Sequence, residues 1–341
     1  MNNPLLSDFK TPYGVPPFDK IKEQHFIPAT LEAIKIHEQE IQAITNNTEE
    51  PDFENTILAL EKSGALLTRV RNVFSNINSS LTNDEIQRIA KELAPLVSAH
   101  KDAIKLNEGL FKRVKSVYLK RDELELDSES MRLLEETYSS FVRSGADLNN
   151  VNKEILKEIN KKLSVLTLQF GQNVLADVNE FKLVIDDRKD LAGLPESKIK
   201  AAEITAQENG LEGKWVFTVQ KPSLIPFITY AENRDLREKL FKAYINPGNN
   251  NNQNDNKEII KEITHLRAER ADLLGYESHA DYILSRNMAK NPDTVYEFLH
   301  KIWRPSLKRA SEEKAELQQM ILDEGNSFEL MPWDWWYYSN K

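Results

Sequence analysis

Hydrophobic residues recur three or four positions apart over most of the chain, a spacing that places them on one face of an α-helix. In the first such run, Phe26, Ala33, Ile34, Ile41 and Ile44 share a face. The pattern predicts helices over residues 26–44, 53–77, 86–96, 107–118, 128–144, 149–177, 197–209, 225–244, 255–274, 276–288 and 292–324. We therefore predict a mainly α fold, built as a multi-helix bundle.

A period of two interrupts the helical spacing at two places. Residues 180–185 alternate between polar and apolar side chains, and residues 214–220 are rich in β-branched and aromatic side chains. Both features are typical of strands, so a small two-stranded β element is expected near residues 180–220. The run 246–256 is almost entirely Asn, with Pro247 and Gly248, which predicts a loop.

These patterns divide the chain into three regions. Pro4, Pro12, Pro16 and Pro17 exclude a regular helix at the start, because proline lacks a backbone N–H and fixes φ. We predict an extended N-terminal arm over residues 1–20, a helical bundle over 21–178, and a third region over 179–341 that holds the β element and further helices. The boundary near residue 178 follows the change from helical to strand spacing.

Composition narrows the possible partners. The chain has 45 Lys and Arg residues against 54 Asp and Glu, a net charge of −9, and a negative surface opposes binding to a nucleic-acid backbone. The absence of cysteine excludes disulfides, cysteine-ligated metal centres and a thiol nucleophile. No stretch reaches the roughly 18 consecutive apolar residues of a membrane span. We therefore expect neither nucleic acid nor a membrane as a partner.

The first residues of the chain bear on its location. They contain neither the basic region nor the apolar region of an export signal. A cytoplasmic location is expected, or a periplasmic one if a signal has been trimmed.

Two groups of residues resemble parts of a metal site. His37 and Glu38 begin like the zinc signature H-E-x-x-H, but position 41 is Ile, so the second ligand on that helical face is missing. His265 and Glu269 share a face four residues apart, and His279 lies ten residues beyond Glu269. Such His–Glu pairs arise often in charged helices, so we interpret them as surface polar residues. A self-contained metalloenzyme that uses these three residues remains an alternative.

Other catalytic patterns are absent from the sequence. The glycines form neither G-x-G-x-x-G nor G-x-x-x-x-G-K-[ST], the loops that cradle phosphates. No G-x-S-x-G nucleophile elbow occurs. We predict no catalytic, cofactor-binding or metal-binding residue within the chain.

The C-terminal end is densely aromatic. Residues 331–338 hold three of the five tryptophans. So much apolar area is a liability unless it packs against the body or continues into a partner surface. We expect either that this segment is docked or that the natural chain goes on.

Several segments together carry a resemblance to a known family. They are residues 3–6, 18–21, 53–57, 96–100, 141–146, 168–173, 210–218, 230–234, 254–260 and 332–338. With these segments the chain resembles the N-terminal half of a bacterial peptidyl-dipeptidase of the thimet-oligopeptidase-like zinc metallopeptidases.

The resemblance implies a helical, two-lobed shell around a deep channel that admits short unstructured peptides. This chain would form one wall of that channel. In the family, a zinc ion held by the two His of H-E-x-x-H and by a Glu from a following helix activates a water molecule. Peptidyl-dipeptidases of this group release dipeptides from the C-terminus of the substrate. Family members are about twice as long and carry the zinc motif well beyond the segment that matches residues 332–338.

The chain is therefore expected to be the N-terminal part of a zinc oligopeptidase, truncated before the zinc motif. We expect it to bind no zinc itself and to be inactive alone. Its expected partners are short unstructured peptides and the missing C-terminal catalytic half. The alternative is a stand-alone, non-catalytic helical module that binds peptides in a half-channel.

Overall fold

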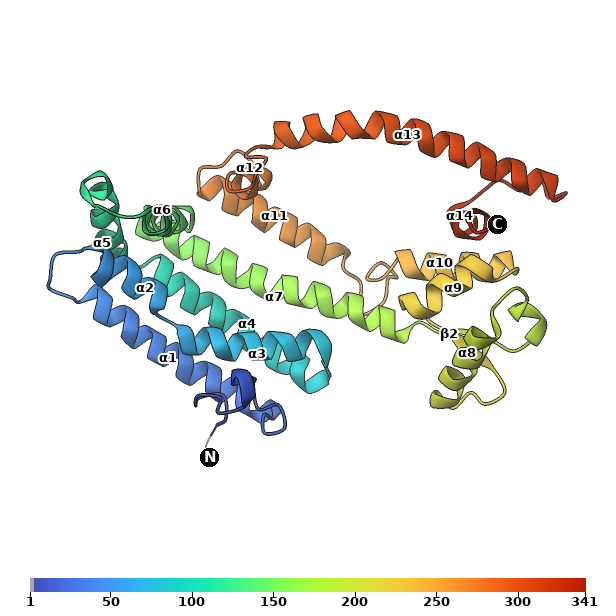
Figure 1. The fold of residues 1–341 in the computed structure, drawn as a ribbon, viewed down its shortest axis with the longest axis horizontal. Coiled ribbons are helices and arrows are strands. Elements are labelled where there is room, and N and C mark those ends of the chain that lie inside the picture. The colour runs from blue at the N-terminus through green and yellow to red at the C-terminus, as the bar shows by residue number, and fades with distance from the viewer. Residues whose placement is uncertain (1–2) are drawn as a thin grey trace. The chain divides into compact units, whose positions relative to one another are not determined.

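The structure, a computed structural model, describes residues 3–341 and is mainly helical (Figure 1). Its α-helices are α1 (Phe26–Thr45), α2 (Ala59–Lys62), α3 (Ala65–Ser80), α4 (Asp84–Lys105), α5 (Glu108–Leu119), α6 (Ser128–Arg143), α7 (Asn150–Glu180), α8 (Glu196–Glu208), α9 (Lys221–Tyr230), α10 (Arg234–Ile245), α11 (Lys257–Leu273), α12 (His279–Leu284), α13 (Pro292–Asp323) and α14 (Pro332–Ser339). The predicted mainly α fold is confirmed.

The β element also forms as predicted. Strands β1 (Leu183–Ile185) and β2 (Trp215–Phe217) pair antiparallel, with Val184 opposite Val216. Helix α8 packs against β2. The period of two in the sequence therefore corresponds to one short antiparallel pair of strands within a helical protein.

Two of the predicted helices are interrupted. The helix predicted over 53–77 is a π-helical turn (Phe53–Leu58) followed by α2 and α3, with a break at Gly64, whose φ is +71°. An added Cβ at this position would lie 2.6 Å from the ring of His37, so the break requires glycine. The helix predicted over 225–244 is α9 and α10. Helix α10 starts anew where the Asn233 side chain accepts a hydrogen bond from the Leu236 N–H.

Two other helices differ in length from their predictions. Helix α4 continues through Pro95 to Lys105 instead of ending at residue 96, and its buried face extends past the proline to His100. That packing outweighs the one hydrogen bond that proline cannot donate. Helix α12 covers only part of residues 276–288, because the turn that ends α11 uses Gly275 at φ +77° and a bond from the Tyr276 N–H back to α11.

The chain divides into two compact units. The first contains the chain up to Gln169 together with Ile263–His279, and the second contains Phe170–Glu262 and Ala280–Lys341. Helices α7 and α11 each begin in one unit and end in the other. Each unit is thus assembled from segments that are not contiguous in the sequence.

Each unit has its own apolar core. In the first unit, one cluster joins the N-terminal arm, through the fully buried Leu5, to α1, α3 and α4. A second cluster joins α1 to the π-helical turn, α5 and α6 around Leu110 and Phe141. In the second unit, the β pair and α8, α9 and α10 enclose Phe217 and Phe227. The burial of these side chains holds each unit together.

The last helix is anchored by one buried carboxylate. Asp334, in the first turn of α14, is fully buried and accepts hydrogen bonds from Arg237 Nη2 at 2.8 Å and Arg234 Nη2 at 2.9 Å, both on α10. Arg237 is itself only 1% exposed and also donates to the carbonyl oxygens of Ala231 and Trp333. Because the charges are paired, they can be buried, and they hold α14 against α9 and α10. The aromatic segment 332–338 is therefore docked.

A second buried carboxylate organises the Asn-rich loop. Asp177, near the end of α7, accepts hydrogen bonds of 2.7–2.9 Å from the Gly248 N–H and from the side-chain amides of Asn250, Asn252 and Asn254. Burial acts to raise the pKa of Asp177, but these hydrogen bonds outweigh it and hold that pKa below its usual value. The loop predicted over 246–256 is thus an ordered loop wrapped around one side chain.

Asp334→Asn is expected to lower the free energy of unfolding by about 3–5 kcal/mol, because two arginines, one of them buried, lose their counter-ion. Urea unfolding followed by tryptophan fluorescence measures this change. Asp323→Asn, at an exposed position on α13, is the matched control and should change the free energy by less than about 0.5 kcal/mol. Equal effects of the two substitutions would contradict the anchoring role of Asp334.

Asp177→Asn is expected to lower the free energy of unfolding by about 1–3 kcal/mol at neutral pH, because the new amide N–H groups face other donors. The folded-state pKa of Asp177 is lowered, so its contribution is fully present above the unfolded pKa of about 3.9 and is lost as the pH falls through the folded pKa. Wild-type and variant stabilities should therefore converge in acid.

Equilibrium unfolding at neutral pH and at successively lower pH values tests this convergence. Asp186→Asn is the control, because Asp186 is exposed and pairs with Lys214 at the surface. If the wild-type chain keeps its full advantage over Asp177→Asn in acid, the assignment to the Asp177 carboxylate is wrong.

Candidate functional site

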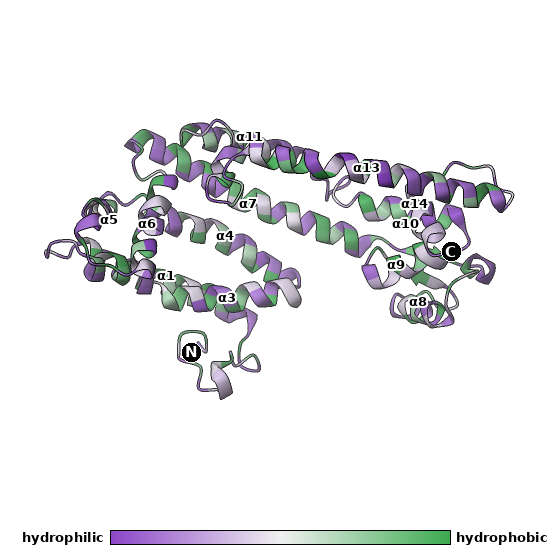
Figure 2. Cartoon of the chain, turned by 45° about the horizontal axis from the view of Figure 1, so that its top comes forward, coloured by the Kyte–Doolittle hydropathy of each residue, from purple (hydrophilic) through white to green (hydrophobic). Residues whose placement is uncertain are grey.

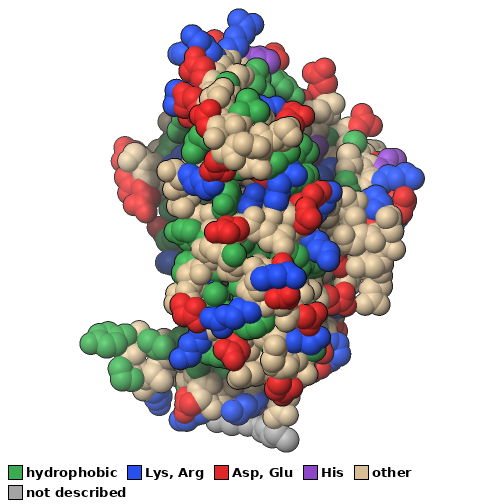
Figure 3. Space-filling model, turned by 90° about the vertical axis from the view of Figure 1, so that its right-hand side faces the viewer, with side chains coloured by type: hydrophobic (Ala, Val, Ile, Leu, Met, Phe, Trp, Pro, Cys, Tyr) green, Lys and Arg blue, Asp and Glu red, His purple; other side chains and the backbone are tan. Residues whose placement is uncertain are grey.

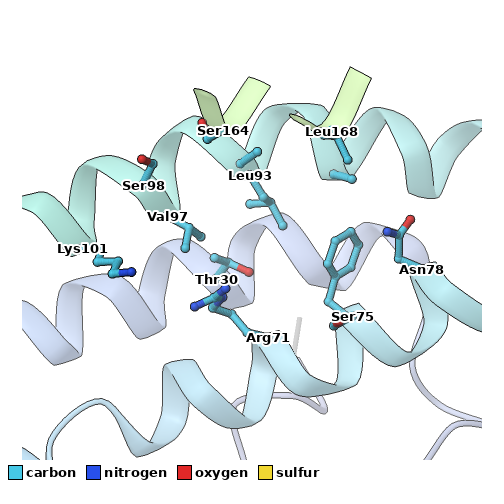
Figure 4. Close-up of a pocket in the computed structure, with 13 residues that line it drawn as sticks. Thr30, Arg71, Ser75, Asn78, Leu93, Val97, Ser98, Lys101, Ser164 and Leu168 are labelled. Atoms are coloured by element: carbon cyan, nitrogen blue, oxygen red, sulfur yellow. The ribbon is translucent and has the colours of Figure 1, made fainter. Parts of the chain in front are cut away.

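The first unit carries a groove between α3 and α4 (Figure 4). A pocket of about 430 Å³ is lined by residues of α1, α3, α4 and α7. A second pocket of about 290 Å³ shares Arg71, Val97 and Lys101 with the first, so the two adjoin. We call these two pockets together the α3–α4 groove.

The first pocket of the groove combines apolar and polar side chains with two cations, and the second pocket adds Glu61 and Lys105 to the lining. Phe74, Leu93 and Val97 supply apolar surface, and hydroxyl groups come from Thr30, Ser75, Ser98 and Ser164. Arg71 and Lys101 reach into the space between α3 and α4 (Figure 4), and neither forms an ion pair with another described residue. This lining suits an extended peptide that carries a carboxylate, because cations bind carboxylates and apolar surface binds side chains.

His37 and His100 form a polar cluster at one end of the groove. His100 Nε2 lies 3.0 Å from His37 Nδ1, and His37 Nε2 lies 3.1 Å from Ser63 Oγ. Burial lowers the pKa of His37, its neighbour His100 lowers it further, and Glu40 and Glu38 oppose the shift without cancelling it. Burial also lowers the pKa of His100. Both rings are therefore mainly neutral at pH 7.

This series of residues is not arranged as a nucleophile and its base. The Ser63 hydroxyl donates to the Leu60 carbonyl oxygen at 2.7 Å, so Ser63 Oγ accepts from His37 Nε2–H. His37 Nδ1 then accepts from His100 Nε2–H. An imidazole that directs its proton toward the serine cannot remove the serine proton. We interpret the cluster as structural, because the His37 ring also fills the space beside Gly64.

The other candidates from the sequence do not converge on a metal site. Among residues 3–341, no group of three or more His, Cys, Asp or Glu side chains is placed to hold a metal ion. His265 and Glu269 are exposed on α11. Burial lowers the pKa of His279, and the nearby Arg270 and Arg267 lower it further, a field that also repels a metal cation. The described residues of this chain therefore do not fit a zinc ion.

Sequence reasoning missed Arg71 and Lys101. They lie on different helices, and each is one of 45 basic residues, so only the packing of α3 against α4 brings them to one groove. Nothing in the sequence distinguishes them from other exposed cations. Only the fold shows that these two cations lie in the same groove.

On the face shown in Figure 3, acidic and basic side chains are interspersed. A nucleic-acid interface gathers basic side chains on one face, and this face does not do so. Within residues 3–341, none of the helices has the length and apolar character needed to cross a membrane.

Comparison with known proteins gives the family of the chain. Residues 227–341 match the family model described as Peptidase family M3. Over 339 residues the chain is 39% identical to dipeptidyl carboxypeptidase from Escherichia coli (strain K12), covering 99% of this chain and 50% of that protein. Over 345 residues it is 31% identical to oligopeptidase A from the same organism, covering 100% of this chain and 50% of that protein.

The comparisons confirm the resemblance found in the sequence. The chain spans about half the length of the curated relatives that it matches. The docked segment 332–338, anchored by Asp334, lies within the matched region. The chain therefore belongs to Peptidase family M3 and corresponds to an N-terminal half of the proteins that it matches.

Proposed function

We propose that the chain is the N-terminal part of a zinc-dependent oligopeptidase that releases C-terminal dipeptides from short peptides. The observation that carries this proposal is the 39% identity to dipeptidyl carboxypeptidase over 99% of the chain, against 31% to oligopeptidase A. The names of these relatives supply the dipeptide specificity, which therefore comes to this chain only as a proposal.

In this proposal the zinc ligands belong to the half of the protein outside this chain. The sequence contains no H-E-x-x-H, and the described residues offer no suitable group of ligands. When bound by the other half, zinc polarises the scissile carbonyl group and activates water. The chain alone is accordingly inactive. Residues 179–341 would form the start of the peptidase domain, and a cytoplasmic location remains a prediction.

The contribution of this chain is to bind and orient the substrate as one wall of the peptide channel. The α3–α4 groove supports this role, because its lining accepts an extended backbone and its side chains. Arg71 and Lys101 would hold a carboxylate of the peptide by charge-assisted hydrogen bonds. Binding in an extended form also favours short, unstructured peptides over folded proteins.

A fusion of residues 1–341 to the remaining half of the Escherichia coli dipeptidyl carboxypeptidase tests the proposal. We expect this chimera to release dipeptides from the C-terminus of a short peptide, and we expect residues 1–341 alone to release none. Mass spectrometry of the products identifies the bond that is cleaved. Chelation should abolish the activity and added zinc should restore it. Zinc-dependent cleavage by residues 1–341 alone would contradict the division of roles.

Arg71 and Lys101, which form no ion pair with another described residue, also favour the second candidate, a non-catalytic module that binds peptides. Calorimetry with residues 1–341 and a short peptide tests binding without cleavage. Arg71→Ala and Lys101→Ala are each expected to weaken binding about tenfold, because each removes a charge-assisted contact to the peptide carboxylate.

Two controls make the groove test specific. Lys91→Ala changes an exposed cation of α4 outside the groove and should leave binding unchanged. A peptide with an amidated C-terminus should bind weakly to the wild-type chain and be insensitive to Arg71→Ala. Tight binding of the amidated peptide would show that Arg71 and Lys101 do not bind the C-terminal carboxylate of the peptide.

A further inference from the structure

Most of helix α13 lies without a packing partner among the described residues of its own unit. The helix runs over Pro292–Asp323, and its buried residues, Leu317 and Ile321, lie near its C-terminal end. From residue 296 to residue 312 every side chain is exposed. The C-terminal end of α13 packs against α14, where Leu317 and Ile321 meet Leu330 and Tyr338.

The exposed part of α13 is amphipathic. Its large apolar residues are Tyr296, Phe298, Leu299, Ile302, Trp303 and Leu307, which we call the α13 stripe. Tyr296, Phe298 and Trp303 are 61%, 60% and 62% exposed. At 3.6 residues per turn, all six fall within one half of the helix circumference. Figure 2 shows this mixture of hydrophobic and hydrophilic residues as alternating colours along the ribbon of α13.

The opposite half of the helix is built for contact with water. It carries Lys301, Arg304 and Lys308, and Lys308 pairs with Glu312 at the surface. Such a division between a charged half and an aromatic half is what a helix shows when one side is covered by protein. An uncovered stripe of this size marks an interaction surface.

Nothing within α13 compensates for the missing contacts. Pro305 removes a backbone hydrogen bond in the middle of the exposed part. Asn291 caps the start by accepting from the Thr294 N–H at 2.9 Å, and surface pairs such as Arg309 with Glu313 add little. Helical stability in proteins comes mainly from the packing of an amphipathic face, and here that packing begins only at Leu317.

We infer that the α13 stripe is the docking surface for the C-terminal half of the parent protein. The relatives contain about as much polypeptide again as this chain, because the chain spans only 50% of each. Helix α14, anchored by Asp334, lies beside the C-terminal end of α13 (Figure 1). Polypeptide that continues from this region in the relatives therefore starts beside the packed end of the helix that carries the stripe. The inference rests on the proposed function, which assigns the catalytic groups to that same half.

Hydrogen–deuterium exchange compares residues 1–341 with the chimera that carries the second half of the Escherichia coli dipeptidyl carboxypeptidase. In the isolated chain, amides of residues 295–307 should exchange rapidly. In the chimera they should exchange at least about tenfold more slowly, because the covered helix opens less often. Equal, rapid exchange in both proteins would overturn the inference.

The double variant Leu299→Glu/Trp303→Glu gives a second, independent measurement. Both side chains are exposed in the isolated chain, so its melting temperature should change by less than about 1 °C. In the chimera the new carboxylates would be buried, and the melting temperature should fall by about 4 °C or more. Lys301→Glu, on the opposite half of the same helix, is the control and should be neutral in both proteins.

The second half can also be supplied as a separate polypeptide. Tagged residues 1–341 and the Lys301→Glu variant should capture it, and the double variant should not. Capture by all three proteins would overturn the inference. So would a homodimer of residues 1–341 that the double variant dissociates, since the stripe would then bind a second copy.

Activity of the chimera separates this inference from the proposed function. If α13 becomes protected but no dipeptide is released, the docking surface stands and the proposed function fails. If dipeptides are released while α13 exchanges rapidly and the double variant is neutral, the function stands and the docking surface is wrong.

Discussion

The position of α14, and with it the packed end of α13, depends on the buried ion pairs between Asp334 and two arginines of α10. Asp334 and Arg237 are both buried, so the loss of either partner would leave a charge without compensation. The same cations also hold the aromatic residues: Arg234 lies 4.2 Å from the ring centre of Phe328, and Arg237 lies 4.1 Å from that of Tyr337. The aromatic residues near the C-terminus thus pack against arginines that the buried Asp334 holds in place.

The second unit contains two buried carboxylates that are satisfied in different ways. Asp334 is neutralised by cations, whereas Asp177 keeps its charge through neutral amide donors from the Asn-rich loop. Both join segments that lie more than seventy residues apart in the sequence. Each carboxylate therefore helps to fix one segment: the terminal helix in one case, and the entry to α11 in the other.

Helical spacing predicted most of the fold because the apolar faces of these helices are regular. It failed where a single residue overrides the pattern, as at Gly64, where His37 leaves no room for a side chain, and at Asn233, which caps a new helix. It also failed at Pro95, where tertiary packing carries α4 past a proline. The common location of distant residues, such as Arg71 and Lys101 in one groove, could not be predicted, because spacing within one helix carries no information about its neighbour. The family was recognisable because several segments matched together, although none of them contains the H-E-x-x-H motif.

The arrangement explains how half of a peptidase can fold and still be incomplete. Each compact unit encloses its own apolar core, and in the second unit the buried Asp334 is paired with Arg237 of the same unit. What lacks packing is the exposed apolar face of α13. This helix is held at one end by α14 and carries exposed aromatic residues over most of the rest. Under the proposed function, such a chain would supply a substrate-binding wall and would leave the chemistry to the C-terminal half, which on our inference also covers α13. Assembly and catalysis would then be coupled, because the half that would dock on α13 is also the half proposed to carry the catalytic groups.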